Sequence, residues 1–222
     1  MDFKTARAAM VESQIRPNGV RDAKILAAFA AIPREFFVSG SGMALAYRDE
    51  IVPVEDETAG SKTRYLLAPM TLAKLISAAN IGAASKVLDV GGVCGYSAAI
   101  LRSLGAAVFA LENSESLAVK ARENLLKTGI EGVSCVVGPL PDGFAANQPY
   151  DVILLNGSVT GEPQKLFGQL AEGGRLVAIL SEGWQGHAYI YTKTGGAISG
   201  RAIFDASAPV LPGFEAAQQF VF

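Results

Sequence analysis

The feature that most constrains the fold is a regular alternation of two hydrophobic patterns between residues 87 and 180. Short, almost wholly apolar runs rich in β-branched residues are typical of strands buried on both faces of a parallel sheet. These runs alternate with longer segments of helical spacing, which end at Gly105, Gly129 and Gly173. The strand-like runs span 87–90, 107–112, 133–137, 151–156 and 175–180, and the helix-like segments span 96–104, 115–128 and 163–171. This alternation predicts an α/β fold with a doubly wound, mostly parallel sheet.

The first 68 residues lack this alternation and are expected to form short helices and loops. Helical spacing covers residues 6–15, and Asp22 can cap a second helix. The polar stretch 53–64 shows no clear periodicity and is expected to be a loop. Pro69 then opens a further helix, because proline is well tolerated in a first helical turn.

At the other end of the chain, two strand-like segments flank Thr194-Gly195-Gly196, which predicts an antiparallel hairpin. A chain of 222 residues, of which 50% are hydrophobic and 18% charged, suits one domain with a large core. We therefore expect a single domain over 1–222. This domain would comprise an N-terminal helical and loop region (1–68) and a Rossmann-like core (69–222).

Composition limits which binding partners and which cellular compartment are expected for this protein. A formal net charge of −2 gives no reason to expect nucleic acid or anionic membranes as partners. Cys94 and Cys135 are too few for a disulfide framework, and the N-terminus lacks the apolar core of a signal peptide. No apolar run reaches the length of a membrane span. We expect a cytoplasmic protein without a metal site, because the single histidine, His187, has no evident partner ligands nearby.

The candidate binding site is a glycine-rich turn that follows the first strand of the alternating region. Asp89 lies in that strand, and Gly91, Gly92 and Gly95 lead into the next helix. Glycines there permit positive φ angles and the close approach of a ligand to the backbone. Glu112 ends the following strand, where an acid can accept hydrogen bonds from both hydroxyls of a ribose. The pattern predicts a nucleoside-type ligand, although the same turn can also be a structural strand-to-helix connection.

The glycine spacing bears on which nucleoside binds. A dinucleotide-binding turn reads G-x-G-x-x-G, and Val93 and Tyr96 occupy two of those glycine positions. The turn of S-adenosylmethionine-dependent methyltransferases typically has an acid at the strand end, followed by glycines at alternate positions. Asp89, Gly91 and Gly95 match this second pattern, and Val93 departs from it.

Two neighbouring residues are further candidates for this pocket. Asn156 ends the strand-like run 151–156, at the carboxyl edge where ligands bind in open α/β sheets. Cys94 lies inside the glycine turn at the start of a helix, a position that can lower the pKa of a thiol. A small side chain lining the cofactor pocket is the simpler interpretation of Cys94.

Several blocks, in the same order along the chain, resemble the protein-L-isoaspartate O-methyltransferase family. They are MVESQIRPNGVRD (10–22), IPREFFV (32–38), AYRDEIVPV (46–54), KVLDVGGVCGYSAAIL (86–101), KARENL (120–125), PYDVILLN (149–156) and LAEGGRLVAIL (170–180). The resemblance implies transfer of a methyl group from S-adenosylmethionine to the α-carboxylate of L-isoaspartyl residues in damaged proteins, as a repair reaction. It also implies that the cofactor is bound by Asp89, Gly91, Gly92, Gly95, Glu112 and Asn156, and that the N-terminal region (1–68) faces the substrate.

The chain departs from the family pattern at positions that matter for binding. In the family, a serine two residues before a proline hydrogen-bonds the substrate carboxylate, and Leu67 stands there in this chain. An aspartate that holds the adenine amino group is replaced by Pro139, and a glycine of the turn is replaced by Val93. Each lost buried contact costs about 1–3 kcal/mol, so weaker binding of cofactor or substrate is expected.

The loop over residues 54–68 is longer than its counterpart in the family and offers replacements for the missing serine. Its candidate donors to a substrate carboxylate are Thr58, Ser61, Lys62, Thr63 and Arg64, and arginine can pair with a carboxylate in a bidentate manner. The same residues can equally serve only to solubilise a loop. Two alternatives to the repair enzyme therefore stay open: a non-catalytic binding or scaffold protein, and a methyltransferase with a different acceptor.

Overall fold

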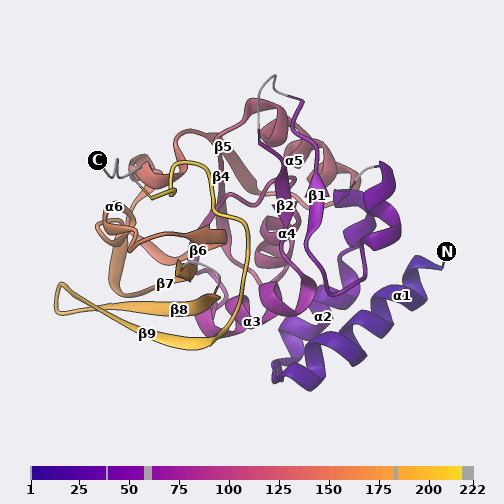
Figure 1. Ribbon diagram of the computed structural model, residues 1–222, viewed down its shortest axis with the longest axis horizontal. Coiled ribbons are helices and arrows are strands. Elements are labelled where there is room, and N and C mark those ends of the chain that lie inside the picture. Colours follow the sequence, from indigo (N-terminus) through magenta and orange to yellow (C-terminus); the bar gives the residue numbers. More distant parts are fainter. Residues whose placement is uncertain (1, 39, 58–61, 183–184, 217–222) are drawn as a thin grey trace, which may run out of the picture.

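A single seven-stranded sheet forms the centre of the computed structural model, which describes residues 2–38, 40–57, 62–182 and 185–216 (Figure 1). The strand order is β5-β4-β3-β6-β7-β8-β9. Strands β3 to β7 are parallel, whereas β8 and β9 are antiparallel to their neighbours. The strands are β3 (Lys86–Val90), β4 (Ala107–Glu112), β5 (Val133–Val137), β6 (Tyr150–Val159), β7 (Leu170–Glu182), β8 (Gln185–Thr194) and β9 (Ala197–Asp205). The chain order reverses at β3, which places a ligand crevice beyond the carboxyl ends of β3 and β6.

The helices begin at residues whose local chemistry favours a helix start. Asp22 accepts hydrogen bonds from two backbone N–H groups of the first turn of α2, and Pro69 is the first residue of α3. The α-helices are α1 (Phe3–Met10), α2 (Ala23–Ala31), α3 (Pro69–Ala79), α4 (Tyr96–Ser103), α5 (Glu115–Lys127) and α6 (Gln164–Phe167). After α1 the chain continues through a π-helical turn, Val11–Ile15. Within the described ranges, no helix combines the length and apolar character that a bilayer span requires.

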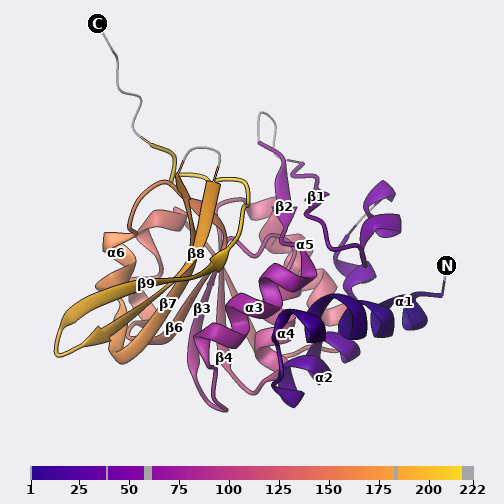
Figure 2. The same cartoon turned by 60° about the horizontal axis from the view of Figure 1, so that its bottom comes forward.

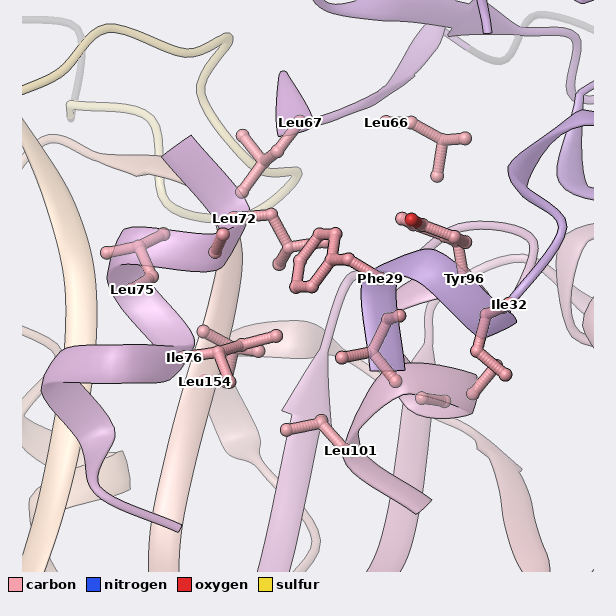
Figure 3. Packing of buried hydrophobic residues seen from close by; sticks show 14 of the residues in the cluster. Phe29, Ile32, Leu66, Leu67, Leu72, Leu75, Ile76, Tyr96, Leu101 and Leu154 are labelled. Carbon is pink, nitrogen blue, oxygen red and sulfur yellow. The ribbon is translucent and has the colours of Figure 1, made fainter. Parts of the chain in front are cut away.

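Two hydrophobic clusters cover the two faces of the sheet. The larger one joins α1 to α5 with side chains such as Val87 and Leu154, and Figure 3 shows its packing around Phe29 and Leu72. The second cluster lies on the opposite face, where Leu88 and Ile153 pack against α6 and neighbouring short turns. The longer helices therefore gather on one face, and Figure 2 shows α1 to α4 on the same side of the sheet.

The alternating region confirms the predicted α/β fold. β4 and β5 have the predicted bounds, and α4 and α5 begin at the predicted residues. The predicted C-terminal hairpin is also present, as β8 and β9. The predicted helix over 163–171 is wrong, because only residues 164–167 are α-helical. Leu170 already pairs with Tyr150 at the start of β7, so the last residues of the predicted helix belong to a strand.

The expectation that residues 53–64 are a loop is wrong at both ends. β1 (Val52–Val54) pairs antiparallel with β2 (Arg64–Leu66) in a small separate sheet. Val52 and Val54 are buried, so packing holds β1 in place. The polar residues that flank these strands hide their hydrophobic pattern in the sequence. Lys120 of α5 donates a hydrogen bond to the carbonyl of Glu55, and the hairpin lies beside α5 in both views (Figures 1 and 2).

The segment after β9 returns to the carboxyl end of β6. The Ser158 N–H donates to the carbonyl of Pro209, and the Leu211 N–H donates to the carbonyl of Ser158. Leu211 is 3% exposed and belongs to the second hydrophobic cluster. This segment, together with β2, therefore closes over the crevice at the end of the sheet.

Candidate functional site

The glycine turn after β3 has the backbone geometry that the sequence predicted. Gly91 has φ of 70° and Gly95 has φ of 93°, both in the left-handed region. Gly92 is fixed for a different reason: a Cβ there would lie 2.6 Å from both the Asp89 Oδ2 and the Ser97 Oγ atoms. The turn therefore tolerates no side chain at Gly92 without moving a buried carboxylate.

Asp89 is fully buried beneath this turn and does not stand alone. Its Oδ2 accepts a hydrogen bond from the Ser97 hydroxyl and its Oδ1 accepts one from the Asn156 amide, each at 2.7 Å. Burial raises the pKa of Asp89 to about 6, against the lowering effect of these two hydrogen bonds, and the nearby charge of Glu112 raises it further. Asn156 also donates to the carbonyl of Val90 at 3.2 Å. The structure thus joins two predicted pocket residues into one buried network.

Glu112 reaches the same site from the end of β4 and binds Arg64 through both carboxylate oxygens. Arg64 Nη1 lies 3.0 Å from Oε2, and Arg64 Nη2 lies 3.2 Å from Oε1. Nη1 also donates to Asn113 Oδ1 at 2.7 Å, and Nη2 donates to the carbonyl of Gly91 at 3.2 Å. Both partners are almost wholly buried, with side-chain exposures of 6% and 5%. Burial raises the pKa of Glu112, and the guanidinium and the N–H donors oppose that rise.

Val93 occupies the turn in a conformation that favours glycine. Its φ is 60° and it is buried, although a β-branched residue in this region costs of order 1–3 kcal/mol. Its N–H donates to Glu112 Oε1 at 2.6 Å, which holds the turn against the end of β4. The backbone of the turn at Val93 therefore binds the predicted ribose acceptor, Glu112, directly.

The space beside the turn is filled by side chains of the chain itself. A Cβ on Gly91 would lie 2.8 Å from Leu211 Cδ2, 3.1 Å from Arg64 Nη2 and 3.4 Å from Leu140 Cδ1. The cavity bordered by Arg64, Asn156 and Leu211 measures only about 20 Å³, and the one beside Glu112 about 10 Å³. Sites for small molecules usually measure roughly 300–1,000 Å³. The polar groups suit an adenosyl ligand, but the space that these side chains leave is too small to hold one.

The other residues singled out in the sequence lie at various distances from this centre. Leu67 is 3% exposed and lies beside Leu72 in the apolar cluster, as Figure 3 shows. Pro139 is exposed, and its neighbour Leu140 is the residue that reaches the turn. Lys62 is exposed and pairs with Glu215 at 3.1 Å. Thr63 borders the same small cavity as Arg64, whereas Thr58 and Ser61 lie outside the described residues.

Cys94 does not serve as a low-pKa thiol. Burial raises its pKa to about 12, and its Sγ donates to the carbonyl of Phe37. It borders a separate cavity of about 230 Å³ with Phe36 and Phe37, rather than the space beside Glu112. The expected lowering by the helix start is overridden because the thiol is fully desolvated.

Sequence reasoning missed four contributors, among them Ser97, which donates to Asp89, and Leu140, which lies beside Gly91. Leu211 comes from the segment after β9, and Asn113 follows Glu112 and accepts from Arg64. Leu211 carries no local signal, because its position depends on backbone pairing with β6. Asn113 was detectable as a polar residue at the carboxyl edge of the sheet.

A Rossmann-like sheet with acids at the ends of β3 and β4, joined by a glycine turn, defines a protein of the methyltransferase class. The chain belongs to the protein-L-isoaspartate(D-aspartate) O-methyltransferase family, whose family model matches residues 5–205. A protein-L-isoaspartate O-methyltransferase of Koribacter versatilis is 41% identical over 175 residues, covering 79% of this chain and 76% of the relative. Another from Methanoculleus marisnigri is 38% identical over 172 residues, covering 78% and 76%.

Two solved structures share the fold of this chain. A protein-L-isoaspartate O-methyltransferase superposes with a TM-score of 0.82 at 27% identity, covering 93% of this chain and 66% of that chain. A putative member from Plasmodium falciparum, solved in complex with S-adenosyl-L-homocysteine, has a TM-score of 0.77 at 19% identity, covering 92% and 97%. At that identity the second structure supports the fold alone.

Proposed function

We propose that this chain is an S-adenosylmethionine-dependent protein carboxyl methyltransferase that acts on L-isoaspartyl residues of damaged proteins. The observation that carries the proposal is the family match over residues 5–205, which spans the turn Gly91–Gly95 and Glu112. The fold brings that turn and that carboxylate together at the carboxyl edge of the sheet. Ligands of open α/β proteins bind at this edge.

The proposed roles follow from the hydrogen-bonding capacity of each group. Glu112 offers two carboxylate oxygens to the hydroxyls of a ribose once Arg64 leaves them. Gly91 lets the ligand approach the backbone, Gly92 and Gly95 allow the turn to pack on the residues beneath it, and Asp89 with Asn156 braces the turn from below. The bound cofactor supplies an electrophilic methyl group on a sulfonium centre.

The acceptor chemistry asks little of the chain. A carboxylate has an ordinary pKa near 4, so it is an anion at pH 7 and needs no general base. The chain must align the carboxylate oxygen with the methyl group and exclude water. The side chain of Leu67 cannot donate a hydrogen bond, so Lys62, Thr63 and Arg64 are the described candidates for binding this carboxylate. Thr58 and Ser61 stay predictions.

The remaining expectations from the sequence also stay predictions. These are a single domain over 1–222, a cytoplasmic location, and the absence of nucleic-acid and membrane partners. The described structure has two free cysteines, which agrees with a reducing compartment.

The test measures binding and turnover separately. Calorimetric titration with S-adenosyl-L-homocysteine should show saturable binding, and an isoaspartyl peptide with S-adenosylmethionine should yield a base-labile methyl ester that releases methanol. The control peptide carries ordinary aspartate at the same position. Binding without peptide methylation would point to a different acceptor.

One observation favours the alternative of a non-catalytic binding protein. Arg64, Leu211 and Leu140 converge on Gly91 and leave little space beside it. If no binding occurs at millimolar S-adenosyl-L-homocysteine, the closed site is the functional state of the chain and the enzymatic proposal is wrong.

A further inference from the structure

Arg64 is the buried cation of the site, and it comes from outside the glycine turn. It lies in β2, at the edge of the small hairpin that the sequence had suggested to be a loop. The residue is 5% exposed, and its guanidinium donates to Glu112, Asn113 and the Gly91 carbonyl. A residue on a separate hairpin thus satisfies the acceptors at the end of β4.

These acceptors are the ones that the proposed function assigns to the ribose. Each carboxylate oxygen of Glu112 faces one terminal nitrogen of Arg64, at 3.0 and 3.2 Å. A bidentate arginine is a strong partner for a carboxylate and takes one acceptor position on each oxygen. The N–H groups of Val93 and Asn113 take a second position on Oε1 and Oε2, so no position stays open for a ribose hydroxyl. Ribose hydroxyls and Arg64 are therefore mutually exclusive partners of Glu112.

A displaced Arg64 would need a new anion. An uncompensated buried charge is strongly unfavourable, and arginine stays protonated at all ordinary pH values. The small cavity next to Arg64 is also bordered by Leu67 and Asn156. Among the described residues that border this cavity, Arg64 is the sole cation. The side chain of Leu67, which by the resemblance stands at the family's carboxylate-binding serine, offers no hydrogen bond there.

We propose that Arg64 exchanges one carboxylate for another: it pairs with Glu112 in the free protein and with the isoaspartyl α-carboxylate when a nucleoside occupies Glu112. This inference rests on the proposed function and names the residue that replaces the missing serine. It makes Arg64 a competitor of the cofactor and a receptor for the substrate. The two ligands then bind in order, because the substrate carboxylate meets a free guanidinium only after the ribose has taken Glu112.

The test uses the full chain and two variants of Arg64. Arg64→Ala removes the guanidinium, and Arg64→Gln keeps a hydrogen-bonding side chain of similar length without the charge. Arg48→Ala removes an exposed arginine of the same N-terminal region and is the matched control. Calorimetry measures the affinity for S-adenosyl-L-homocysteine. Fluorescence anisotropy, at saturating S-adenosyl-L-homocysteine, measures the affinity for a labelled isoaspartyl peptide and for its α-carboxamide analogue.

The two affinities should move in opposite directions. Both Arg64 variants should bind S-adenosyl-L-homocysteine about tenfold more tightly than the unaltered chain, because no internal competitor remains. They should bind the isoaspartyl peptide about tenfold more weakly, because a charge-assisted bidentate contact is lost. The α-carboxamide peptide should bind all four proteins alike, and Arg48→Ala should change neither affinity. A residue with only a structural role would not produce this crossing pattern.

Three results would overturn the inference and are distinguishable. Unchanged or weaker binding of S-adenosyl-L-homocysteine in both variants would show that Arg64 is no competitor. Unchanged binding of the isoaspartyl peptide would show that another group receives the carboxylate, while the proposed function stands. Absence of S-adenosyl-L-homocysteine binding in all four proteins would remove the proposed function itself.

Discussion

The buried carboxyl of Asp89 makes the stability of this protein depend on pH in an unusual direction. The substitution that tests it is Asp89→Asn, which removes the titration and nearly preserves the shape. An asparagine can keep its Oδ1 toward the Asn156 amide and turn its amide toward Ser97, whose hydroxyl can accept instead of donate. The hydrogen-bond network therefore survives, and the charge is what changes.

The magnitude follows from the two pKa values of the carboxyl. Burial raises the pKa of Asp89 from 3.8 to about 6 in the folded protein, so the fold favours the protonated form. That contribution to stability is complete below pH 4 and is lost as pH rises through about 6. A difference of about two pH units, at roughly 1.4 kcal/mol per unit, gives about 3 kcal/mol. Relative to the unaltered chain, Asp89→Asn should gain about that much between pH 4 and pH 7.

Urea denaturation of both proteins at pH 4, 5, 6 and 7, followed by circular dichroism, measures this difference in the free energy of unfolding. Asp142→Asn is the matched control, because Asp142 is a partly exposed aspartate whose Lys165 partner lies at the surface. Its difference from the unaltered chain should stay nearly flat, since exposed ion pairs contribute little. If the Asp89→Asn difference is also flat from pH 4 to pH 7, the carboxyl is ionised in the fold and the reasoning is wrong.

Three further substitutions, with Gly129→Ala as the control for the first, test the turn, the closing segment and the hairpin. Gly95→Ala should lower the free energy of unfolding by about 1–3 kcal/mol, because φ is 93° and the new Cβ would lie 3.3 Å from a neighbouring methyl group. Gly129→Ala, with φ of 70° and open space around it, should cost less, and equal losses in urea denaturation would contradict the packing argument. Leu211→Ala should cost about 2–5 kcal/mol by the same measurement, because the side chain is 3% exposed, and a loss below 1 kcal/mol would mean that the segment is not packed on the sheet. His187→Ala should shift stability by less than about 0.5 kcal/mol, since its partner Asp205 is 92% exposed, and a larger shift at pH 7 would reveal a role that its surface position hides.

The sequence by itself determined the core of the fold. The strands 107–112 and 133–137 were predicted to the residue, because both are short apolar runs bounded by glycines or helix caps, although 133–137 is a partly exposed edge strand. Asp89, the turn glycines and Glu112 were placed correctly at one edge of the sheet, since parallel strands bring their carboxyl ends together. These features follow from local sequence patterns and from the rules for connecting parallel strands, which allow only a few topologies.

The tertiary structure alone decided which groups touch in the site. Arg64 and Glu112 are 48 positions apart, and their pairing requires the hairpin of β1 and β2. That hairpin was not recognised in the sequence, because the residues between its two strands are polar and mask the pattern of the buried Val52 and Val54. Leu211 reaches Gly91 only because the chain pairs with β6 after the last strand. Contacts of this kind depend on the packing of elements that are far apart in the sequence, so no local period encodes them. Folding buries Asp89 and so raises the pKa of its carboxyl, and folding also places Arg64 against Glu112. Neither effect exists in the unfolded chain.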